Sequence, residues 1–277
     1  PAERDGYSQL RVESTQIKPT IFSHSEFVAF AKQVKATFDG WCEATIPKLE
    51  NIAIGDNPKA LIKDIGEDLL ASVEAIALLD EYDMYQHLMS YWDAVMQDDV
   101  YMLVIDGWVE ANTLRVLEKK SKETADLTIK RNKYVADLIP PQLIINRYFA
   151  DEQADLNHLH AELDRTTGEK NDLQEEESGE EGLLAEVIGD NGKISKGNLT
   201  KRIKAIQGDP DSLDELAMLK QYQVLMDAES ALKSDIKKSE EALYTDVVNH
   251  YPSLTESDIQ TILIYDKWLA TLADDLD

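Results

Sequence analysis

Residues 141–173 read PQLIINRYFADEQADLNHLHAELDRTTGEKNDL, and the positions on one side of a helix recur here at alternating steps of three and four. Residues 210–247 follow the same rule and read PDSLDELAMLKQYQVLMDAESALKSDIKKSEEALYTDV. Each stretch opens on a proline, which suits the first turn of a helix because its missing N–H would be unpaired there. The two stretches together predict a long antiparallel helical hairpin, coiled-coil-like, over residues 140–252.

The seam of this hairpin is mostly apolar. It runs through Ile145, Phe149, Glu152, Leu156, Leu159, Leu163, Thr166, Lys170 and Leu173, then Tyr222, Leu225, Glu229, Leu232, Ile236, Ser239, Leu243 and Val247. Polar residues interrupt both arms, which is unusual for a self-sufficient coiled coil. We therefore expect the hairpin to pack on other helices as well, through seam residues drawn from Leu156, Leu159, Leu163, Leu225, Leu232, Ile236 and Leu243.

Outward from the hairpin, the sequence predicts a mainly α fold with a short β element. We expect a helical domain over 1–139, the hairpin over 140–252 with a small tip subdomain at about 178–209, and a C-terminal helix over 253–277. Start signals for helices are a capping box at 23–26, an N-cap at Asn57 before Pro58, and a second capping box at 255–258.

Three features predict where these helices end or give way to strand. Pro47 is expected to break the helix that begins near Phe27, or the turn after it. The pair Asp98-Asp99 is expected to end a helix that includes the aromatic-rich stretch 82–92. The apolar run 100–105 is long enough for a buried strand and too short for a helix of its own.

The net charge of the chain argues against free-standing, non-specific binding to nucleic acid. The net charge is -26, with 54 acidic against 28 basic residues, whereas non-specific phosphate binding relies on clustered Lys and Arg. The sign reverses locally over 115–133 and over 193–204. Each reversal is either a solvated segment whose cations pair with the abundant acids or a phosphate-contacting edge. The candidate DNA-contacting residues are Lys119, Lys120, Lys122, Lys130, Arg131, Lys133, Lys201, Arg202 and Lys204.

The composition also indicates in which cellular compartment the chain is expected. No apolar run approaches the ~18 residues needed to cross a bilayer. Cys42 is the only cysteine, which excludes an intramolecular disulfide and a cysteine-rich zinc site and fits a reducing cytoplasm. The polar first residues lack an initiator methionine, so we expect no signal peptide at this end and a piece cut from a longer protein.

Motifs for catalysis are missing from the sequence. It contains no phosphate-cradling or nucleophile-elbow glycine motif of the forms G-x-x-x-x-G-K-[ST], G-x-G-x-x-G or G-x-S-x-G. His158 and His160 are two residues apart on a helix and point in different directions, so they make poor joint metal ligands. We expect His87 to be a buried or hydrogen-bonded core histidine. No catalytic, cofactor-binding or metal-binding residue is assigned.

Several blocks of the sequence, taken in order, resemble the C-terminal part of the modification subunit of type I restriction enzymes. The blocks are PKALI (58–62), EDLL (67–70), LDEYDMYQHLMSYW (79–92), MQDDVY (96–101), DGW (106–108), YFADEQ (148–153), EEGLLAEVI (180–188), LTE (254–256) and DKWLA (266–270). The resemblance covers most of the chain, and ordered agreement over several blocks is more specific than any single motif.

The resemblance implies a function in DNA modification. That family transfers a methyl group from S-adenosylmethionine to adenine N6, within a complex of modification, specificity and restriction subunits that acts on DNA. Its catalytic motif, Asn/Asp-Pro-Pro-aromatic, does not occur here: Asn57-Pro58 is followed by Lys59, and Pro140-Pro141 is preceded by Ile139. The resemblance therefore implies a non-catalytic assembly and DNA-clamping region downstream of the catalytic domain.

Its helices would pack on the helical spacers of the specificity subunit. The alternative is a stand-alone helical adaptor that binds another helical protein and has no role on DNA. A hydrolase or metalloenzyme lacks a supporting constellation of residues.

Overall fold

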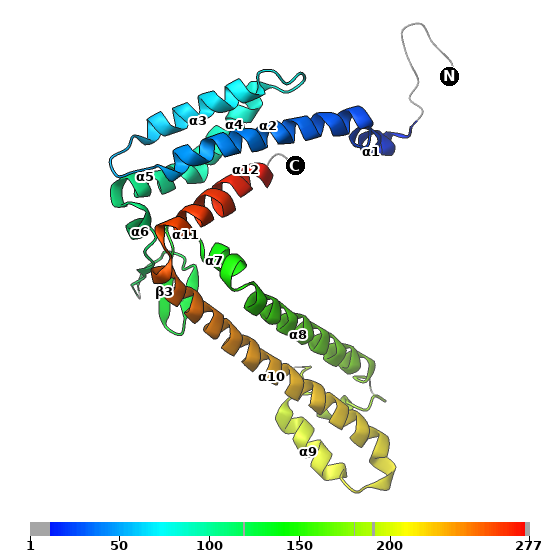
Figure 1. Cartoon of the computed structure of the whole chain (residues 1–277). Helices are drawn as coiled ribbons and strands as arrows, with labels where there is room; N and C mark the ends of the chain where they lie inside the picture. The colour runs from blue at the N-terminus through cyan, green and yellow to red at the C-terminus, as the bar shows by residue number, and fades with distance from the viewer. Residues whose placement is uncertain (1–11, 119, 180, 190–191, 275–277) are drawn as a thin grey trace, which may run out of the picture. The chain divides into compact units, whose positions relative to one another are not determined.

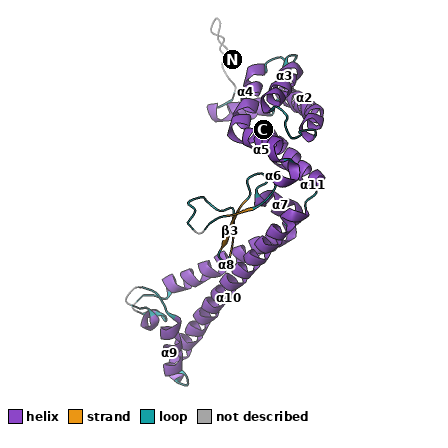
Figure 2. Cartoon of the chain, turned by 90° about the vertical axis from the view of Figure 1, so that its left-hand side faces the viewer, coloured by secondary structure: helices purple, strands orange, loops and turns teal. Residues whose placement is uncertain are grey.

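The computed structural model describes residues 12–118, 120–179, 181–189 and 192–274. It confirms the predicted fold class, which is mainly α with a small three-stranded antiparallel sheet and a long helical hairpin (Figures 1 and 2). The chain forms two compact units. The first comprises the residues up to 115 together with 136–143 and the residues from 252 onward; the second comprises 116–135 and 144–251.

The first unit is built from helices. They are α1 (Ile17–Phe22), α2 (Ser25–Glu50), α3 (Pro58–Val73), α4 (Glu81–Tyr91), a π-helical segment (Trp92–Met96), α5 (Gln97–Asp106), α6 (Trp108–Ala111), α11 (Glu256–Gln260), a second π-helical segment (Thr261–Leu269) and α12 (Ala270–Asp274), preceded by a 3-10 turn at Ser14–Gln16. The largest fully buried side chain of this unit is Trp268. Two further tryptophans of this unit donate hydrogen bonds from their indole N–H groups. Trp41 donates to the Ile65 carbonyl and Trp108 to the Ile52 carbonyl, each at 3.0 Å.

A buried ion pair joins two segments of this core that lie far apart in sequence. The carboxylate of Asp99 on α5 accepts hydrogen bonds from the Lys267 ammonium at 2.9 Å and from the Trp268 indole at 2.8 Å. The same ammonium donates to the Leu138 carbonyl at 2.7 Å. Burial raises the pKa of Asp99 above its ordinary value, while Lys267 and the indole N–H favour the ionised form.

Two of the predicted helix starts are confirmed. Asn57 caps α3, with its side chain accepting from the Lys59 N–H at 3.0 Å and Pro58 in the first helical position. Thr255 and Asp258 form a reciprocal capping box at α11. The predicted box at 23–26 is wrong: α2 is capped by the His24 side chain, which accepts from the Glu26 N–H, and Ser23 instead ends α1.

The predicted strand at 100–105 is also wrong. These residues form most of α5, and the chain is helical without a gap from Glu81 to Asp106. The apolar positions Val100, Leu103 and Val104 lie three to four residues apart and are buried on one side of that helix. Asp99 does not end the preceding helix, because its charge is paired inside the core.

Pro47 does not break α2, which continues to Glu50. The proline stands in the last turn, where it removes a single backbone hydrogen bond. The carbonyl of Pro47 accepts from the side-chain amide of Asn51 at 2.7 Å, so the end of the helix is capped just beyond the proline.

The second unit holds the sheet and the hairpin. Strands β1 (Arg115–Val116), β2 (Leu127–Ile129) and β3 (Asn132–Val135) lie in the order β1-β3-β2, with Thr128 opposite Lys133. The hairpin arms are α8 (Ala150–Glu176) and α10 (Leu213–His250), which run side by side (Figures 1 and 2). At 27 and 38 residues, they extend over about 40 and 57 Å.

The first arm is not one continuous helix. The helix that starts at Pro141 is the separate α7 (Pro141–Tyr148), and Phe149 leaves helical geometry before α8 begins. The ring of Phe149 packs edge-on against His250 at the end of α10, with centroids 5.6 Å apart. This contact gives Phe149 a tertiary reason to leave the helix.

The tip between the arms has a hydrophobic cluster of its own. It contains Leu184, Val187, Ile194, Leu199, Ile206, Leu219 and Tyr222. A 3-10 turn (Ala185–Val187), α9 (Lys196–Ile206) and the start of α10 supply five of these seven side chains, and a second 3-10 turn (Pro210–Ser212) leads into α10. Within the described part of the chain, no helix is both long and apolar enough to cross a bilayer.

Candidate interaction surfaces

The seam residues predicted to bind a partner fall into two groups. Leu156, Ile236 and Leu243 are 4%, 6% and 3% exposed. The remaining four, Leu159, Leu163, Leu225 and Leu232, are only partly buried. A two-helix pair cannot cover the whole width of its apolar stripe, and the partly buried leucines are the positions that a further helix would cover.

Two of the polar breaks in the seam, Lys170 and Glu229, are paired with each other within the hairpin. The Lys170 ammonium on α8 pairs with the Glu229 carboxylate on α10, and Lys233 donates to the same carboxylate at 2.5 Å. Lys170 and Glu229 are 17% and 14% exposed, and hydrogen bonds from the two lysines hold the pKa of Glu229 below its ordinary value. This pairing explains the interruptions at Lys170 and Glu229 without an external partner.

The α9 basic segment is partly neutralised. Arg202 forms a bidentate ion pair with Glu215 on α10, at 2.6 and 3.0 Å, and is therefore committed to the tip. Lys201 and Lys204 are exposed. Of the candidate DNA-contacting residues on α9, these two lysines have no carboxylate partner among the described residues.

The other basic segment forms the three-stranded sheet, which the sequence reading treated as a solvated segment or a phosphate edge. Its cations Lys120, Lys122, Lys130, Arg131 and Lys133 are all exposed, and no described residue forms an ion pair with them. Lys119 lies outside the described residues. Arg115 is different: its guanidinium pairs with Asp137, holding the pKa of that carboxyl below its ordinary value.

The turn between β2 and β3 concentrates this charge. It consists of Lys130 and Arg131 alone, between the paired residues Ile129 and Asn132. Lys130 has φ of 55°, in the left-handed region where glycine or asparagine is more favourable. The turn borders an open polar pocket of about 440 Å³, whose other wall on α10 carries Lys237, Glu240, Glu241 and Tyr244. Of the two cations in the turn, Lys130 is thus held in a backbone conformation that costs strain.

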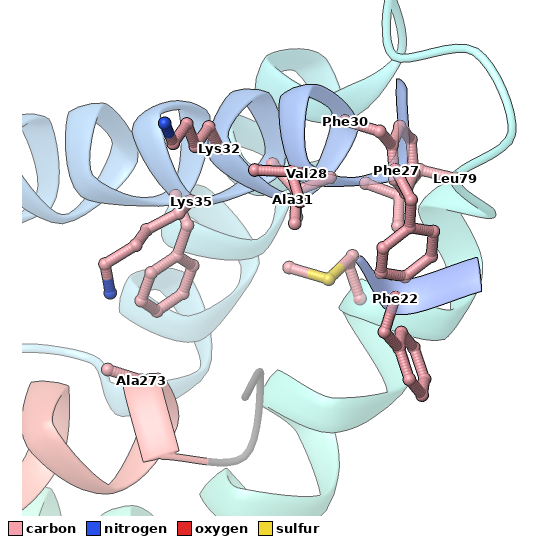
Figure 3. Close-up of a pocket in the computed structure, with 12 residues that line it drawn as sticks. Phe22, Phe27, Val28, Phe30, Ala31, Lys32, Lys35, Leu79 and Ala273 are labelled. Carbon is pink, nitrogen blue, oxygen red and sulfur yellow. The ribbon is translucent and has the colours of Figure 1, made fainter. Parts of the chain in front are cut away.

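An apolar groove lies in the first unit (Figure 3). Its volume is about 570 Å³, and its walls come from α1, α2, the loop before α4, α4 and α12. Phe22 and Phe27 lie at one end, 4.9 Å apart between centroids, and Lys35 and Ala273 lie at the other. The sequence analysis did not predict this groove, although Phe27, Phe30 and Val34 of its lining follow the three-and-four spacing of an apolar helix face.

The histidines form no metal site among the described residues, where no group of three potential ligands could hold an ion. His87 is exposed, so its expected place in the core is wrong. Three of the other histidines contact neighbours: His24 caps α2, His160 lies 3.8 Å from Glu240, and His250 packs against Tyr148 and Phe149.

Comparison of the chain with models of known protein families, with curated proteins and with solved structures finds no match. Fold and function therefore rest on the residues themselves.

Proposed function

We propose that this chain is a non-catalytic assembly and DNA-clamping region of a type I modification methyltransferase subunit. In this proposal the hairpin docks on the helical spacers of the specificity subunit, and the cations of the sheet contact the DNA backbone. The restriction subunit joins the same complex. Methyl transfer from S-adenosylmethionine belongs to the catalytic domain of the parent subunit, whose motifs do not occur in this sequence.

The hairpin is the observation that carries the proposal. Its arms are longer than an ordinary globular helix requires, and they leave four leucines only partly buried along the seam. An apolar stripe on paired helices is the surface that another helix or helical pair covers in helix-on-helix recognition. The same hairpin would also suit a stand-alone adaptor, so DNA contact and the upstream catalytic domain are what separate the two functions.

The docking surface is tested by binding to the specificity subunit of the same system. Leu159→Asp and Leu232→Asp each place a charge at one of the partly buried seam leucines. Each variant should bind the specificity subunit at least about tenfold more weakly, which corresponds to roughly 1.4 kcal/mol. Leu213→Asp is the matched control, because Leu213 is 63% exposed at the start of α10 and lies outside the four leucines. Far-UV circular dichroism establishes that each variant keeps its helices.

Unchanged binding by both seam variants, with their helices intact, would show that the hairpin is not the docking surface. A chain that does not bind the specificity subunit at all would favour the adaptor. S-adenosylmethionine titrated into this chain should give no binding heat, and a clear isotherm would contradict the non-catalytic assignment.

DNA contact is tested in the assembled enzyme by charge reversal at the turn. Lys130→Glu with Arg131→Glu should weaken binding to a labelled duplex and reduce the slope of log K against log salt by up to about 1.8, because each phosphate contact contributes about 0.9. Lys201→Glu with Lys204→Glu measures the α9 surface separately. Lys32→Glu with Lys35→Glu, on α2, controls for the change in net charge. If the turn variant behaves like the α2 control, the sheet does not contact DNA.

A further inference from the structure

The groove in the first unit leaves an apolar helix face uncovered. No residue of α1 is buried, and the first buried residue of α2 is Phe38, in the middle of that helix. Ile21 is 51% exposed, Phe22 49% and Val28 38%. Large apolar side chains grouped in this way on a soluble surface are typical of an interaction site.

The loop before α4 adds to the same surface. Leu79 lines the groove, and its neighbour Leu78 is 96% exposed with φ of 73°. A leucine rarely adopts that backbone conformation, since its Cβ is crowded there and glycine is not. The loop therefore holds an apolar side chain in solvent beside the groove, in a strained conformation.

The charge at the groove is opposite to that of the whole chain. Among the described residues, its lining includes Lys32 and Lys35 and no carboxylate. Both lysines are exposed, and neither forms an ion pair with a described residue. Since the chain carries 54 acidic residues, two unpaired lysines beside an apolar groove form a local site for negative charge.

We propose that this groove binds an amphipathic helix of a partner protein whose apolar stripe is flanked by carboxylates. The apolar stripe would lie along the groove over Phe22, Phe27 and Val28, and the carboxylates would pair with Lys32 and Lys35. Helix-in-groove recognition uses anchors three and four residues apart, and the groove is itself lined by helices. This inference does not depend on the proposed function, because it concerns a different unit of the chain.

The test uses two labelled synthetic helical peptides with the same leucine stripe, one flanked by Glu and the other by Lys. Each is titrated with the full chain, and binding is followed by fluorescence anisotropy. Ala31 lines the groove at an exposed position on α2, so Ala31→Trp should fill the groove with a larger side chain. Peptide binding that is lost in this variant is therefore assigned to the groove. Groove binding should be at least tenfold tighter for the Glu-flanked peptide at low salt, and the difference should shrink as salt rises. The net charge of -26 would by itself favour the Lys-flanked peptide.

Charge reversal supplies a second variant that does not alter the apolar lining. Lys32→Glu with Lys35→Glu should invert the preference between the peptides. The matched control is Lys201→Glu with Lys204→Glu on α9, which has the same spacing and exposure and should leave the preference unchanged. A groove preference for the Lys-flanked peptide, an absence of groove binding for both peptides, or an unchanged preference in the reversal variant would overturn the proposal. So would sedimentation data in which the chain forms a dimer that Ala31→Trp dissociates, because the occupant would then be a second copy.

Discussion

Removing the charge of Asp99 should destabilise the first unit more than any conservative change on its surface. Asp99→Asn keeps the size of the side chain but leaves the Lys267 ammonium, 13% exposed, without its counter-charge. The variant also replaces an acceptor that serves both Lys267 and the Trp268 indole.

The magnitude follows from the contacts. Hydrogen bonds to a charged group contribute about 1.5–3 kcal/mol each, and breaking a buried pair by removing one partner costs about 3–5 kcal/mol. Lys267 keeps one bond to the Leu138 carbonyl, and the cost of burying the Asp99 charge, which raises its pKa, offsets part of the contribution of the pair. Both effects place the expected loss at the lower end, about 3 kcal/mol. With an m-value of about 2 kcal/mol/M in urea, the unfolding midpoint should fall by about 1.5 M.

The assay uses the position of the tryptophans. All four of them, Trp41, Trp92, Trp108 and Trp268, lie in the first unit, so tryptophan emission in urea follows this unit and not the hairpin. Asp98→Asn is the control, because it makes the same chemical change at an exposed neighbour and should shift the midpoint by less than about 0.3 M, corresponding to the ~0.5 kcal/mol typical of surface changes.

A shift below about 0.5 M for Asp99→Asn, or equal shifts for both variants, would refute the reasoning, since the ion pair would then contribute little beyond a surface charge. The raised pKa of Asp99 gives a second check. An acid whose pKa is higher in the folded state loses stability as pH rises from its unfolded pKa to its folded pKa. Asp99→Asn should remove that part of the pH dependence.

Three further predictions concern single side chains. Glu229→Gln should lower hairpin stability at pH 7 by about 1–2 kcal/mol, measured by circular dichroism in urea. Because hydrogen bonds from Lys170 and Lys233 lower the pKa of Glu229 in the folded hairpin, the difference from wild type should disappear as pH falls through that lowered pKa, and a constant difference would contradict the pairing. Burial raises the pKa of Cys42 to about 12, so a thiol reagent at pH 8 should react far more slowly than with a free cysteine unless urea is added. Gly66→Ala should cost about 1–3 kcal/mol by thermal unfolding, since its Cβ would lie 2.8 Å from the Tyr85 ring; an unchanged midpoint would mean that the ring moves freely.

The hairpin was predictable because its signal is long. Steps of three and four sustained over both arms leave no competing periodicity, and a proline lies shortly before each arm, Pro141 at the start of α7 and Pro210 in the 3-10 turn before α10. The register then pairs Lys170 with Glu229, so the two polar breaks could have been assigned to each other from the antiparallel arrangement. Only the break at Phe149 needed tertiary information, because His250 is more than a hundred positions away.

The short elements were harder to predict. The apolar run 100–105 is ambiguous by periodicity, and its helical state is set by continuity with the preceding helix and by the Asp99 pair. The β2–β3 hairpin was not predicted, because its turn is Lys130-Arg131 and not one of the Asn-Gly or Asp-Gly dipeptides that signal a two-residue turn. The groove was beyond any local pattern, since its walls come from segments between Phe22 and Ala273.

The coding sequence upstream of Pro1 tests the central claim most directly. If the chain is the assembly region of a type I modification subunit, the reading frame upstream should encode a glycine-containing cofactor loop followed by an Asn/Asp-Pro-Pro-aromatic motif. An upstream frame that stops before these motifs, or that encodes an unrelated domain, would contradict the claim and leave the helical adaptor as the better description of this chain.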